Sequence, residues 1–219
     1  MQLSRIPRAV LFDMDGVIFD SERATYETWK AVAARHGFEQ LDVPYMKSIG
    51  VNAQTCRQHF LDFYGPDFPY DAYQAEQSRD YHARYDHGRL PLKPFVRETL
   101  SLLRDRGLGL ALASSTRTPV VEAQLRDAGL LPFFSVVIGG DQVSHSKPDP
   151  EIFLAAAAAL GVSPADCAVI EDSYNGIRAA HRGGMMGIMV PDMLPPTEEM
   201  ERLAAGILRD LSELPALLG

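Results

Sequence analysis

The sequence predicts an α/β fold in which a parallel β-sheet carries helices on both faces and is interrupted by a long helical segment. One observation is a short apolar run, Ala9–Phe12, that ends at a pair of aspartates and a glycine. Another is the regular alternation of short apolar segments and helical segments beyond residue 91. Between these regions lie about seventy residues with helical periodicity and no strand pattern.

The apolar run Ala9–Phe12 has the length of a strand that is buried on both faces. Asp13 and Asp15 follow it two residues apart, so in an extended chain they point to the same side. Gly16 then allows a sharp turn. Open α/β sheets bind ligands just beyond the carboxyl ends of their strands, which is where this pair is expected. An Asp-x-Asp pair alone is a weak signal, because most such pairs are solvated turn residues.

Residues 21–90 are expected to form a helical insertion. Helical periodicity indicates a helix over 22–36, which Gly37 ends, and further helical pieces rich in aromatic residues follow it. The connection far exceeds the usual ~2–6 residues between neighbouring elements. We therefore predict a helical cap with its own core over 21–90, placed above the first strand, and a sheet core made of residues 1–20 and 91–219.

The remaining segments alternate strand and helix. Glycines such as Gly107 and Gly161 end predicted helices, and Thr118 before Pro119 is expected to be the N-cap of another. The predicted strands are 108–113, 134–138, 168–170 and 186–190, and the predicted helices are 95–106, 118–129, 149–161, 175–182 and 197–203. Such alternation implies right-handed crossovers and a parallel sheet. The predicted core is therefore Rossmann-like, with helices on both faces.

Composition and charge argue against several classes of protein. The chain has 219 residues, a net charge of −8 and a pI near 5.2, which disfavours nucleic acid or an anionic membrane as a partner. The longest apolar stretch, 152–162, is too short to span a bilayer, and the N-terminus lacks the apolar centre of a signal peptide. Cys56 and Cys167 match no metal-ligand spacing and are too few for a disulfide framework. We therefore expect a soluble, cytoplasmic protein with free thiols.

Polar residues follow several predicted strands at the edge where the carboxyl ends of the strands meet. They are Asp13 and Asp15, then Ser114, Ser115 and Thr116, then Lys147 late in its loop, and finally Glu171 and Asp172. Each group alone has an ordinary explanation as a cap, a turn or a solvated side chain. Together they combine separated acidic groups, a hydroxyl-rich loop before a helix and one lysine. That combination is typical of a phosphate group held beside a divalent cation.

The acidic groups and the lysine suit a metal-held phosphate. Mg²⁺ prefers one or two carboxylates together with water and phosphate oxygens, and Asp13 with Glu171 or Asp172 can supply these carboxylates. Lys147 supplies a compact positive charge for the phosphoryl group or for an attacking carboxylate. The partner implied by this chemistry is a small phosphorylated metabolite.

The hydroxyl-rich loop suits the remaining phosphate oxygens. The Ser114 hydroxyl and the backbone N–H groups of Ser115 and Thr116, next to a helix N-terminus, can bind them. One aspartate of the first strand can then attack phosphorus and form an acyl phosphate. The other can protonate the leaving alcohol and later deprotonate water.

Four motifs, in this order and spacing, resemble those of the haloacid dehalogenase superfamily, and the resemblance spans nearly the whole chain. The motifs are Asp13-Met14-Asp15-Gly16-Val17, Ser114, Lys147-Pro148-Asp149-Pro150 and Glu171-Asp172-Ser173. The resemblance implies that Asp13 is the nucleophile and a Mg²⁺ ligand. It implies that Asp15 is the general acid/base and offers its backbone carbonyl to the metal. The other implied roles are phosphate binding by Ser114 and Lys147 and metal binding by Asp172 together with Glu171.

The position of the insertion, directly after the first motif, is similar to that in the helical-cap subgroup that contains β-phosphoglucomutase and many sugar-phosphate phosphatases. The resemblance suggests that Gly50 and Asn52, in a loop between helices of the insertion, contact the leaving group and set substrate specificity. Dehalogenases of the superfamily lack the second aspartate of the first motif, so Asp15 favours phosphoryl transfer. The mutases usually carry a histidine where this chain has Thr25, and an arginine after the cap glycine where it has none. These differences favour a phosphatase.

The sequence thus predicts a Mg²⁺-dependent phosphatase that hydrolyses a small phosphorylated metabolite, such as a sugar phosphate, through an aspartyl-phosphate intermediate. The alternative is a phosphosugar mutase similar to β-phosphoglucomutase. A third hypothesis is a non-catalytic phospho-accepting module similar to response-regulator receivers, which share an aspartate, a hydroxyl, a lysine and a metal. Asp15 and the long insertion count against the third hypothesis.

Overall fold

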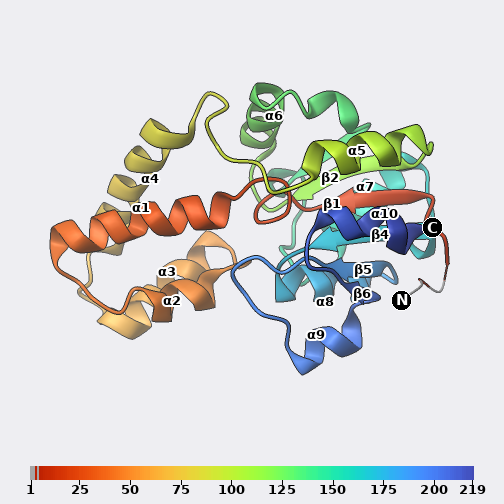
Figure 1. The fold of residues 1–219 in the computed structure, drawn as a ribbon. Coiled ribbons are helices and arrows are strands. Elements are labelled where there is room, and N and C mark those ends of the chain that lie inside the picture. Colours follow the sequence, from red (N-terminus) through yellow and green to blue (C-terminus); the bar gives the residue numbers. More distant parts are fainter. Residues whose placement is uncertain (1–2, 4) are drawn as a thin grey trace.

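The computed structural model describes residue 3 and residues 5–219 and shows a sheet with its helices on one side and a group of helices on the other (Figure 1). The sheet has six strands in the order β3-β2-β1-β4-β5-β6, and all neighbouring strands are parallel. The strands are β1 Ala9–Phe12, β2 Gly109–Ser114, β3 Val136–Gly139, β4 Cys167–Glu171, β5 Met186–Met189 and β6 Gly206–Ile207. This confirms the predicted α/β fold class with a Rossmann-like parallel sheet.

The α-helices divide into those that cover the sheet and those that lie between β1 and β2 in the sequence. The helices around the sheet are α5 Val96–Asp105, α6 Thr118–Asp127, α7 Glu151–Leu160, α8 Tyr174–Arg182, α9 Glu198–Leu203 and α10 Leu214–Leu218. The helices of the insertion are α1 Ser21–His36, α2 Asp42–Ser48, α3 Ala53–Tyr64 and α4 Tyr70–Tyr85.

Each face of the sheet has its own apolar core, because successive side chains of a strand point to opposite faces. Val10 and Phe12 of β1 belong to the core that includes residues of α5, α6 and α10. Ala9 and Leu11 belong to the core on the other face, which includes residues of α7 and α8. All of β1 is buried. The strand is therefore packed from both sides, and this fixes the position of the residues that follow it.

Aromatic residues of the insertion pack against one another, as the sequence predicts. The ring centroids of Trp29 and Phe60 lie 4.9 Å apart, and those of Trp29 and Tyr70 lie 5.7 Å apart. The buried cluster consists of Trp29, Val32, Ala33, Leu41, Tyr45, Ile49, Phe60 and Tyr70. Met193 and Leu194, from the loop after β5, pack against this cluster and join it to the sheet side.

The chain segments that connect the insertion to the sheet run side by side. The Asp20 N–H donates to the Pro91 carbonyl at 2.9 Å, and the Lys93 N–H donates to the Ile18 carbonyl at 2.9 Å. Lys93 Nζ lies 2.6 Å from Asp192 Oδ1 and 3.3 Å from Asp20 Oδ1. Backbone pairing and this lysine together tie both connections to the loop after β5.

Helix α6 and the C-terminal region differ from the sequence prediction. Thr118 is the first residue of α6 rather than its N-cap, which is Arg117, and the Thr118 hydroxyl donates to Asp141 Oδ1 at 2.7 Å. Asp141 Oδ1 also accepts from the Thr118 N–H at 2.7 Å, so a carboxylate from the loop after β3 binds the start of α6. Strand β6 and helix α10 lie beyond the last predicted element; β6 has 2 residues, too few to show an alternating pattern.

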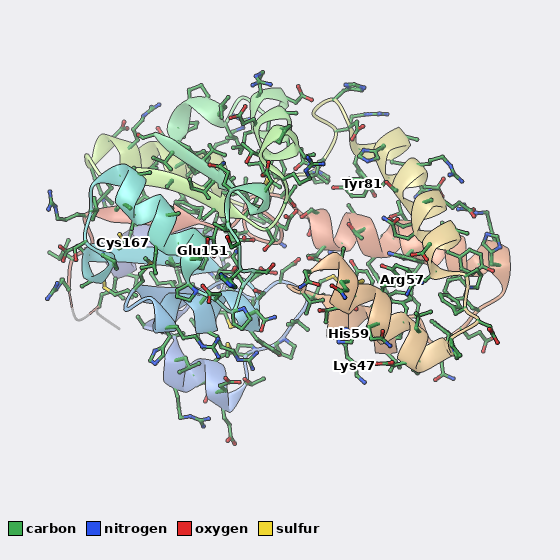
Figure 2. All side chains as sticks on the ribbon, turned by 180° about the vertical axis from the view of Figure 1, so that it is seen from behind. Lys47, Arg57, His59, Tyr81, Glu151 and Cys167 are labelled. Atoms are coloured by element: carbon green, nitrogen blue, oxygen red, sulfur yellow. The ribbon has the colours of Figure 1, made fainter. Side chains whose placement is uncertain are left out.

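Within residues 3 and 5–219, no helix combines the length and the apolar character needed to cross a membrane. Cys56 and Cys167 are free thiols, as expected from their spacing. Figure 2 shows Cys167 at the start of β4, on the side of the sheet that points away from the insertion. This thiol is therefore remote from the carboxyl ends of the strands.

Candidate active site

A cavity of about 350 Å³ lies between the carboxyl ends of the strands and the helical insertion. It is lined by Asp13, Asp15, Glu22, Thr25, Ser48, Gly50, Val51, Asn52, Ala53, Ser115, Thr116, Ser146, Lys147, Glu171, Asp172 and Ser173. Every predicted site residue except Ser114 is among them. The fold therefore brings together residues that lie far apart in the sequence.

Asp13 and Lys147 form a buried ion pair at the base of the cavity. Asp13 directly follows β1, and its backbone N–H donates to the Ile170 carbonyl of β4 at 2.9 Å. Lys147 Nζ lies 2.5 Å from Asp13 Oδ1 and 2.7 Å from Glu171 Oε1, and donates to the Ala113 carbonyl at 3.3 Å. The side chains of Asp13, Lys147 and Glu171 are all buried. One lysine thus links carboxylates from the ends of two neighbouring strands.

The ionisation of this pair follows from burial and from the attraction between its members. Burial raises the pKa of Asp13 well above its ordinary value, and attraction to Lys147 offsets part of that increase. Burial lowers the pKa of Lys147, but attraction to Asp13 and Glu171 outweighs it, so the pKa of Lys147 lies above its ordinary value. Lys147 therefore remains a positive charge at neutral pH.

Asp172 lies in the same acidic group without a hydrogen-bond partner among the described residues. Burial, followed by repulsion from Glu171 and Asp13, raises the pKa of Asp172 well above its ordinary value. Carboxylate oxygens of Asp13, Glu171 and Asp172 all lie within 4.8 Å of one another. Lys147 balances part of this charge, and a divalent cation would balance the rest. The donor set consists of carboxylate oxygens, which fits the preference of Mg²⁺.

Glycines allow the backbone to approach these carboxylates closely. A Cβ on Gly16, which has a φ of +75°, would lie 2.3 Å from Asp172 Oδ2. A Cβ on Gly176 would lie 1.8 Å from Glu171 Oε1. The other oxygen, Glu171 Oε2, accepts hydrogen bonds from the Ser173 N–H at 2.8 Å and the Ser173 hydroxyl at 2.9 Å. The start of α8 therefore holds Glu171 in one orientation.

Asp15 is surrounded by hydroxyl groups rather than by a cation. Asp15 Oδ1 accepts a hydrogen bond from the Ser21 hydroxyl at 2.7 Å. Asp15 Oδ2 accepts from the Thr116 hydroxyl at 3.0 Å and from the Ser114 hydroxyl at 3.4 Å. Asp13 and Asp15 therefore have different partners, although only one residue separates them. The first is ion-paired, and the second is oriented by neutral donors.

The hydroxyl-rich loop after β2 faces the cavity through Ser115 and Thr116. Ser114 is fully buried behind this wall, where its hydroxyl also accepts a hydrogen bond from the Thr116 N–H at 3.0 Å. Ser114 therefore holds the loop and Asp15 in place in this arrangement. Ser115 is the exposed member of the pair that the sequence singled out as phosphate-binding.

The insertion contributes Gly50 and Asn52 to the cavity wall from the loop between α2 and α3. Gly50 has a φ of +72°, and a Cβ there would lie 2.7 Å from the Ser173 Cβ. Asn175 Nδ2 donates to the Gly50 carbonyl at 3.2 Å, which ties the loop to α8. Asn52 Oδ1 accepts from the Thr55 N–H at 2.9 Å and so serves as the N-cap of α3.

Several residues of α1 belong to the site although the sequence analysis assigned them no role. Ser21 binds Asp15, and Glu22 and Thr25 line the cavity. Their residue types form no recognisable motif. Their position offered a signal, however, because a helix that begins a few residues after Asp15 must start beside that aspartate.

Known proteins that are similar to this chain cover most of its length. β-Phosphoglucomutase of Bacillus subtilis is 33% identical over an alignment of 195 positions, which covers 84% of this chain and 83% of the relative. Hexitol phosphatase B of Escherichia coli is 32% identical over an alignment of 228 positions, which covers 96% of this chain and 96% of the relative. The crystal structure of CbbY from Rhodobacter sphaeroides in complex with phosphate has a TM-score of 0.76 and 26% identity, and covers 95% of this chain and 96% of that chain.

The sequence model of the haloacid dehalogenase-like hydrolase family matches residues 7–184. This span starts just before β1 and extends past α8, so it contains every residue that lines the cavity. The family match and the parallel sheet agree with the four motifs found in the sequence. The chain belongs to the haloacid dehalogenase-like hydrolases.

Proposed function

We propose that this protein is a Mg²⁺-dependent phosphatase that releases phosphate from a small phosphorylated metabolite. The observation that carries the proposal is the placement of Asp13, which is paired with Lys147 at the base of the cavity beside Glu171 and Asp172. Asp15 lies next to it among hydroxyl groups. Family membership supports hydrolysis, and the similarity to hexitol phosphatase B supports a phosphorylated metabolite as substrate.

The mechanism uses the two aspartates in different roles. An oxygen of the Asp13 carboxylate attacks phosphorus, and the bond between phosphorus and the leaving oxygen breaks. Asp15, oriented by Ser21 and Thr116, gives its proton to that leaving oxygen. Water then attacks the phosphoryl group on Asp13 while Asp15 takes a proton from the water. Phosphate departs, and both carboxyl groups return to their starting states.

Asp13, Glu171 and Asp172 would hold Mg²⁺, and the backbone carbonyl of Asp15 is a further proposed ligand. When bound, the ion would supply positive charge to the phosphoryl oxygens. The three buried carboxylates, whose oxygens lie within 4.8 Å of one another, support this assignment.

Lys147, Ser115 and Ser114 are the proposed phosphate ligands. Lys147 offers a fixed positive charge at the cavity base, and Ser115 lies on the wall near the start of α6. Ser114 would have to turn its hydroxyl away from Asp15 or Thr116 to reach a phosphate oxygen. The chemistry is assigned to residues 1–20 and 91–219, and the insertion, residues 21–90, is the proposed cap in which Gly50 and Asn52 contact the leaving group.

The observed cavity favours a phosphatase over a mutase. A phosphosugar mutase has to hold a phosphate at either end of its sugar. Among the described residues that line the cavity, Lys147 is the sole lysine or arginine, and it already pairs with Asp13 and Glu171. The similarity to β-phosphoglucomutase keeps the mutase as the second candidate.

The test measures phosphate release from 4-nitrophenyl phosphate with Mg²⁺ and with EDTA. We expect release in Mg²⁺ and loss of release in EDTA. Incubation with β-glucose 1-phosphate separates the candidates, because a phosphatase yields free phosphate and a mutase yields glucose 6-phosphate. Formation of glucose 6-phosphate without free phosphate would contradict the proposal.

A further inference from the structure

A second cavity, of about 230 Å³, adjoins the first and extends to α4. Asp15, Glu22, Thr25 and Thr116 line both cavities. The second cavity is completed by Ser21, Gln77, Ser78, Tyr81, His82, Val120 and Gln124. Figure 2 shows Tyr81 on α4, beside the space between the insertion and the sheet. The proton-transfer residue Asp15 therefore faces a space in which a leaving group can lie.

The charged groups around the two cavities are predominantly acidic. The acidic residues are Asp13, Asp15, Glu22, Glu171 and Asp172. Of the described residues that line either cavity, Lys147 alone is a lysine or arginine, and it is already paired. His82 has its own partner, since its Nδ1 lies 2.9 Å from Asp86 Oδ1. A substrate with a second phosphate or a carboxylate would therefore place that anion among carboxylates, without a free cation.

Two further basic side chains line a neighbouring groove. His145 and Arg182 line a third cavity, which shares Val51, Asn52, Ser146 and Lys147 with the first. Arg182 Nη1 donates to the Pro148 carbonyl at 3.0 Å, and His145 Nδ1 lies 2.9 Å from Glu151 Oε2. Both side chains are held by other partners, so they do not compensate the acidic lining of the two cavities beside Asp15.

Glu22 is a polar group of the insertion that lines both cavities. It lies in the first turn of α1, and Thr25 lies on the same face of the helix, three residues later. The Tyr45 hydroxyl donates to the Glu22 carbonyl at 2.8 Å and to Glu22 Oε2 at 3.2 Å. No donor within the described part of the chain binds Oε1. One carboxyl oxygen is therefore anchored, and the other is available to a ligand.

The ionisation of Glu22 suits an uncharged partner. Burial, followed by repulsion from Asp15, raises the pKa of Glu22 to about 7. The carboxyl group is then partly protonated near neutral pH and can either donate a hydrogen bond to a hydroxyl or accept one from it.

We propose that Glu22 determines substrate specificity by hydrogen-bonding a hydroxyl group of an uncharged polyol, so that the substrates are monophosphates of neutral sugars or sugar alcohols. This inference rests on the proposed phosphatase function. It adds to that function a residue of α1 and excludes bisphosphates and phosphorylated carboxylic acids as preferred substrates.

The experiment compares kcat/KM for sorbitol 6-phosphate, fructose 1,6-bisphosphate, phosphoglycolate and 4-nitrophenyl phosphate, all with Mg²⁺. In the unaltered protein, kcat/KM for sorbitol 6-phosphate should exceed the values for fructose 1,6-bisphosphate and phosphoglycolate by at least about tenfold, because each of these two brings an uncompensated anion. Glu22→Ala should lower the ratio of sorbitol 6-phosphate to 4-nitrophenyl phosphate by at least about tenfold, because the hydroxyl loses its partner. Glu22→Gln keeps a neutral hydrogen-bonding group and should change the ratio by less than about threefold.

The matched control is Glu27→Ala, which alters an exposed glutamate of the same helix that pairs with Lys30 at 2.9 Å. It should leave all the ratios unchanged. The inference would be overturned if Glu22→Ala lowered kcat/KM equally for sorbitol 6-phosphate and 4-nitrophenyl phosphate. It would also be overturned if the unaltered protein preferred the bisphosphate or phosphoglycolate. Either result would leave the phosphatase function intact. Absence of phosphate release from every compound would overturn the proposed function, and the inference with it.

Discussion

The two sides of the active-site cavity are built in different ways. On the sheet side, Asp13, Lys147 and Glu171 are buried, charged and paired with one another at the ends of packed strands. On the insertion side, Asn52 is exposed and Glu22 is partly exposed, and each offers hydrogen-bonding groups rather than ion pairs.

This difference separates the chemistry from substrate selection. Groups at the ends of β1 and β4 are held by strands that are packed on both faces, so the distance from the proposed nucleophile to the proposed metal ligands should vary little. Groups on α1 and the Gly50 loop belong to helices with their own aromatic cluster. Ala24, Leu90 and the hydrogen bond between Asn175 and Gly50 join these helices to the sheet side. Changes on the sheet side should therefore abolish the reaction, whereas changes on the insertion side should alter its selectivity or its efficiency.

The largest effect is expected for Asp13→Asn. The amide is a poor nucleophile, so kcat for 4-nitrophenyl phosphate should fall by at least about 10⁴-fold. The control is Asp105→Asn, which alters an exposed aspartate of α5 and should leave kcat unchanged. Near-normal turnover by the Asp13 variant would remove this residue from the role of nucleophile.

Lys147→Met should have the next largest effect and should impair both activity and stability. We expect kcat to fall by about 10²–10³-fold, because the phosphoryl group loses its fixed positive charge. The free energy of unfolding should fall by about 3–5 kcal/mol, because Asp13 and Glu171 stay buried without their counter-charge. Lys30→Met breaks an exposed pair with Glu27 and should cost only about 0–1 kcal/mol. Urea denaturation measures the free energy of unfolding of both variants. Similar losses of unfolding free energy in Lys147→Met and Lys30→Met would contradict the buried ion pair.

Gly50→Ala tests the contact between the insertion and the sheet. The new Cβ would lie 2.7 Å from the Ser173 Cβ, so the loop must move away from the start of α8. We expect kcat/KM to fall by about 10–100-fold, because a shift of about 1 Å in a positioning loop has effects of this size.

Gly37→Ala is the matched control for Gly50→Ala. Gly37 has a φ of +71°, close to the +72° of Gly50, but a Cβ there meets nothing within 4 Å. Backbone strain is therefore similar in both variants, and the steric contact differs. Equal kcat/KM values for the two variants would show that the contact with Ser173 does not position the loop.

Asn52→Arg should change selectivity by a smaller factor. It places a cation on the cavity wall, so kcat/KM for fructose 1,6-bisphosphate should rise about tenfold relative to sorbitol 6-phosphate. Asn52→Ala also removes the N-cap of α3 but adds no charge, and so controls for the loss of the cap. If Asn52→Arg and Asn52→Ala changed the ratio of kcat/KM values equally, the effect would come from loss of the α3 N-cap rather than from the added charge.

The smallest effect concerns stability and pH. Burial and repulsion from Asp15 raise the pKa of Glu22 from 4.5 to about 7, so the folded state favours the protonated form. The stability that this provides is fully present below pH 4.5 and is lost as the pH rises through 7.

The wild-type protein should therefore become less stable relative to Glu22→Gln across this range. The expected change in relative unfolding free energy is at most about 2 kcal/mol, because the carboxyl group is partly exposed. Urea denaturation at pH 4.5 and pH 8 measures it. A pH-independent difference between the two proteins would show that Glu22 ionises normally.

Much of the sheet side could be predicted because its signals are local. The run Ala9–Phe12 is apolar throughout, and the structure has β1 over the same residues. Once a parallel sheet is expected, the carboxyl ends of its strands must share one edge. This shared edge brings Asp13, Lys147 and Asp172 together. Strand β6 was missed because its 2 residues carry no pattern. Thr118 was misassigned because Asp141, whose carboxylate accepts from the Thr118 hydroxyl, is distant in the sequence.

The insertion side could be predicted only in outline. Helices and their aromatic cluster follow from periodicity, but periodicity does not tell how the helices are oriented against the sheet. The contacts of Glu22 with Tyr45 and of Gly50 with Ser173 depend on that orientation. The buried position of Ser114 likewise depends on the direction its side chain takes at the end of β2.

The amino-acid sequence by itself determined strands β1 to β5, the long insertion and the chemical types that meet at the sheet edge, because hydrophobic periodicity and turn residues act over short distances. Only the tertiary structure decided that Lys147 pairs with Asp13 and Glu171, that Asp15 faces hydroxyl groups, and that Glu22 faces the cavity. These outcomes depend on how the packed faces of separate elements fit together. Packing joins residues across the whole chain, and no local pattern records it.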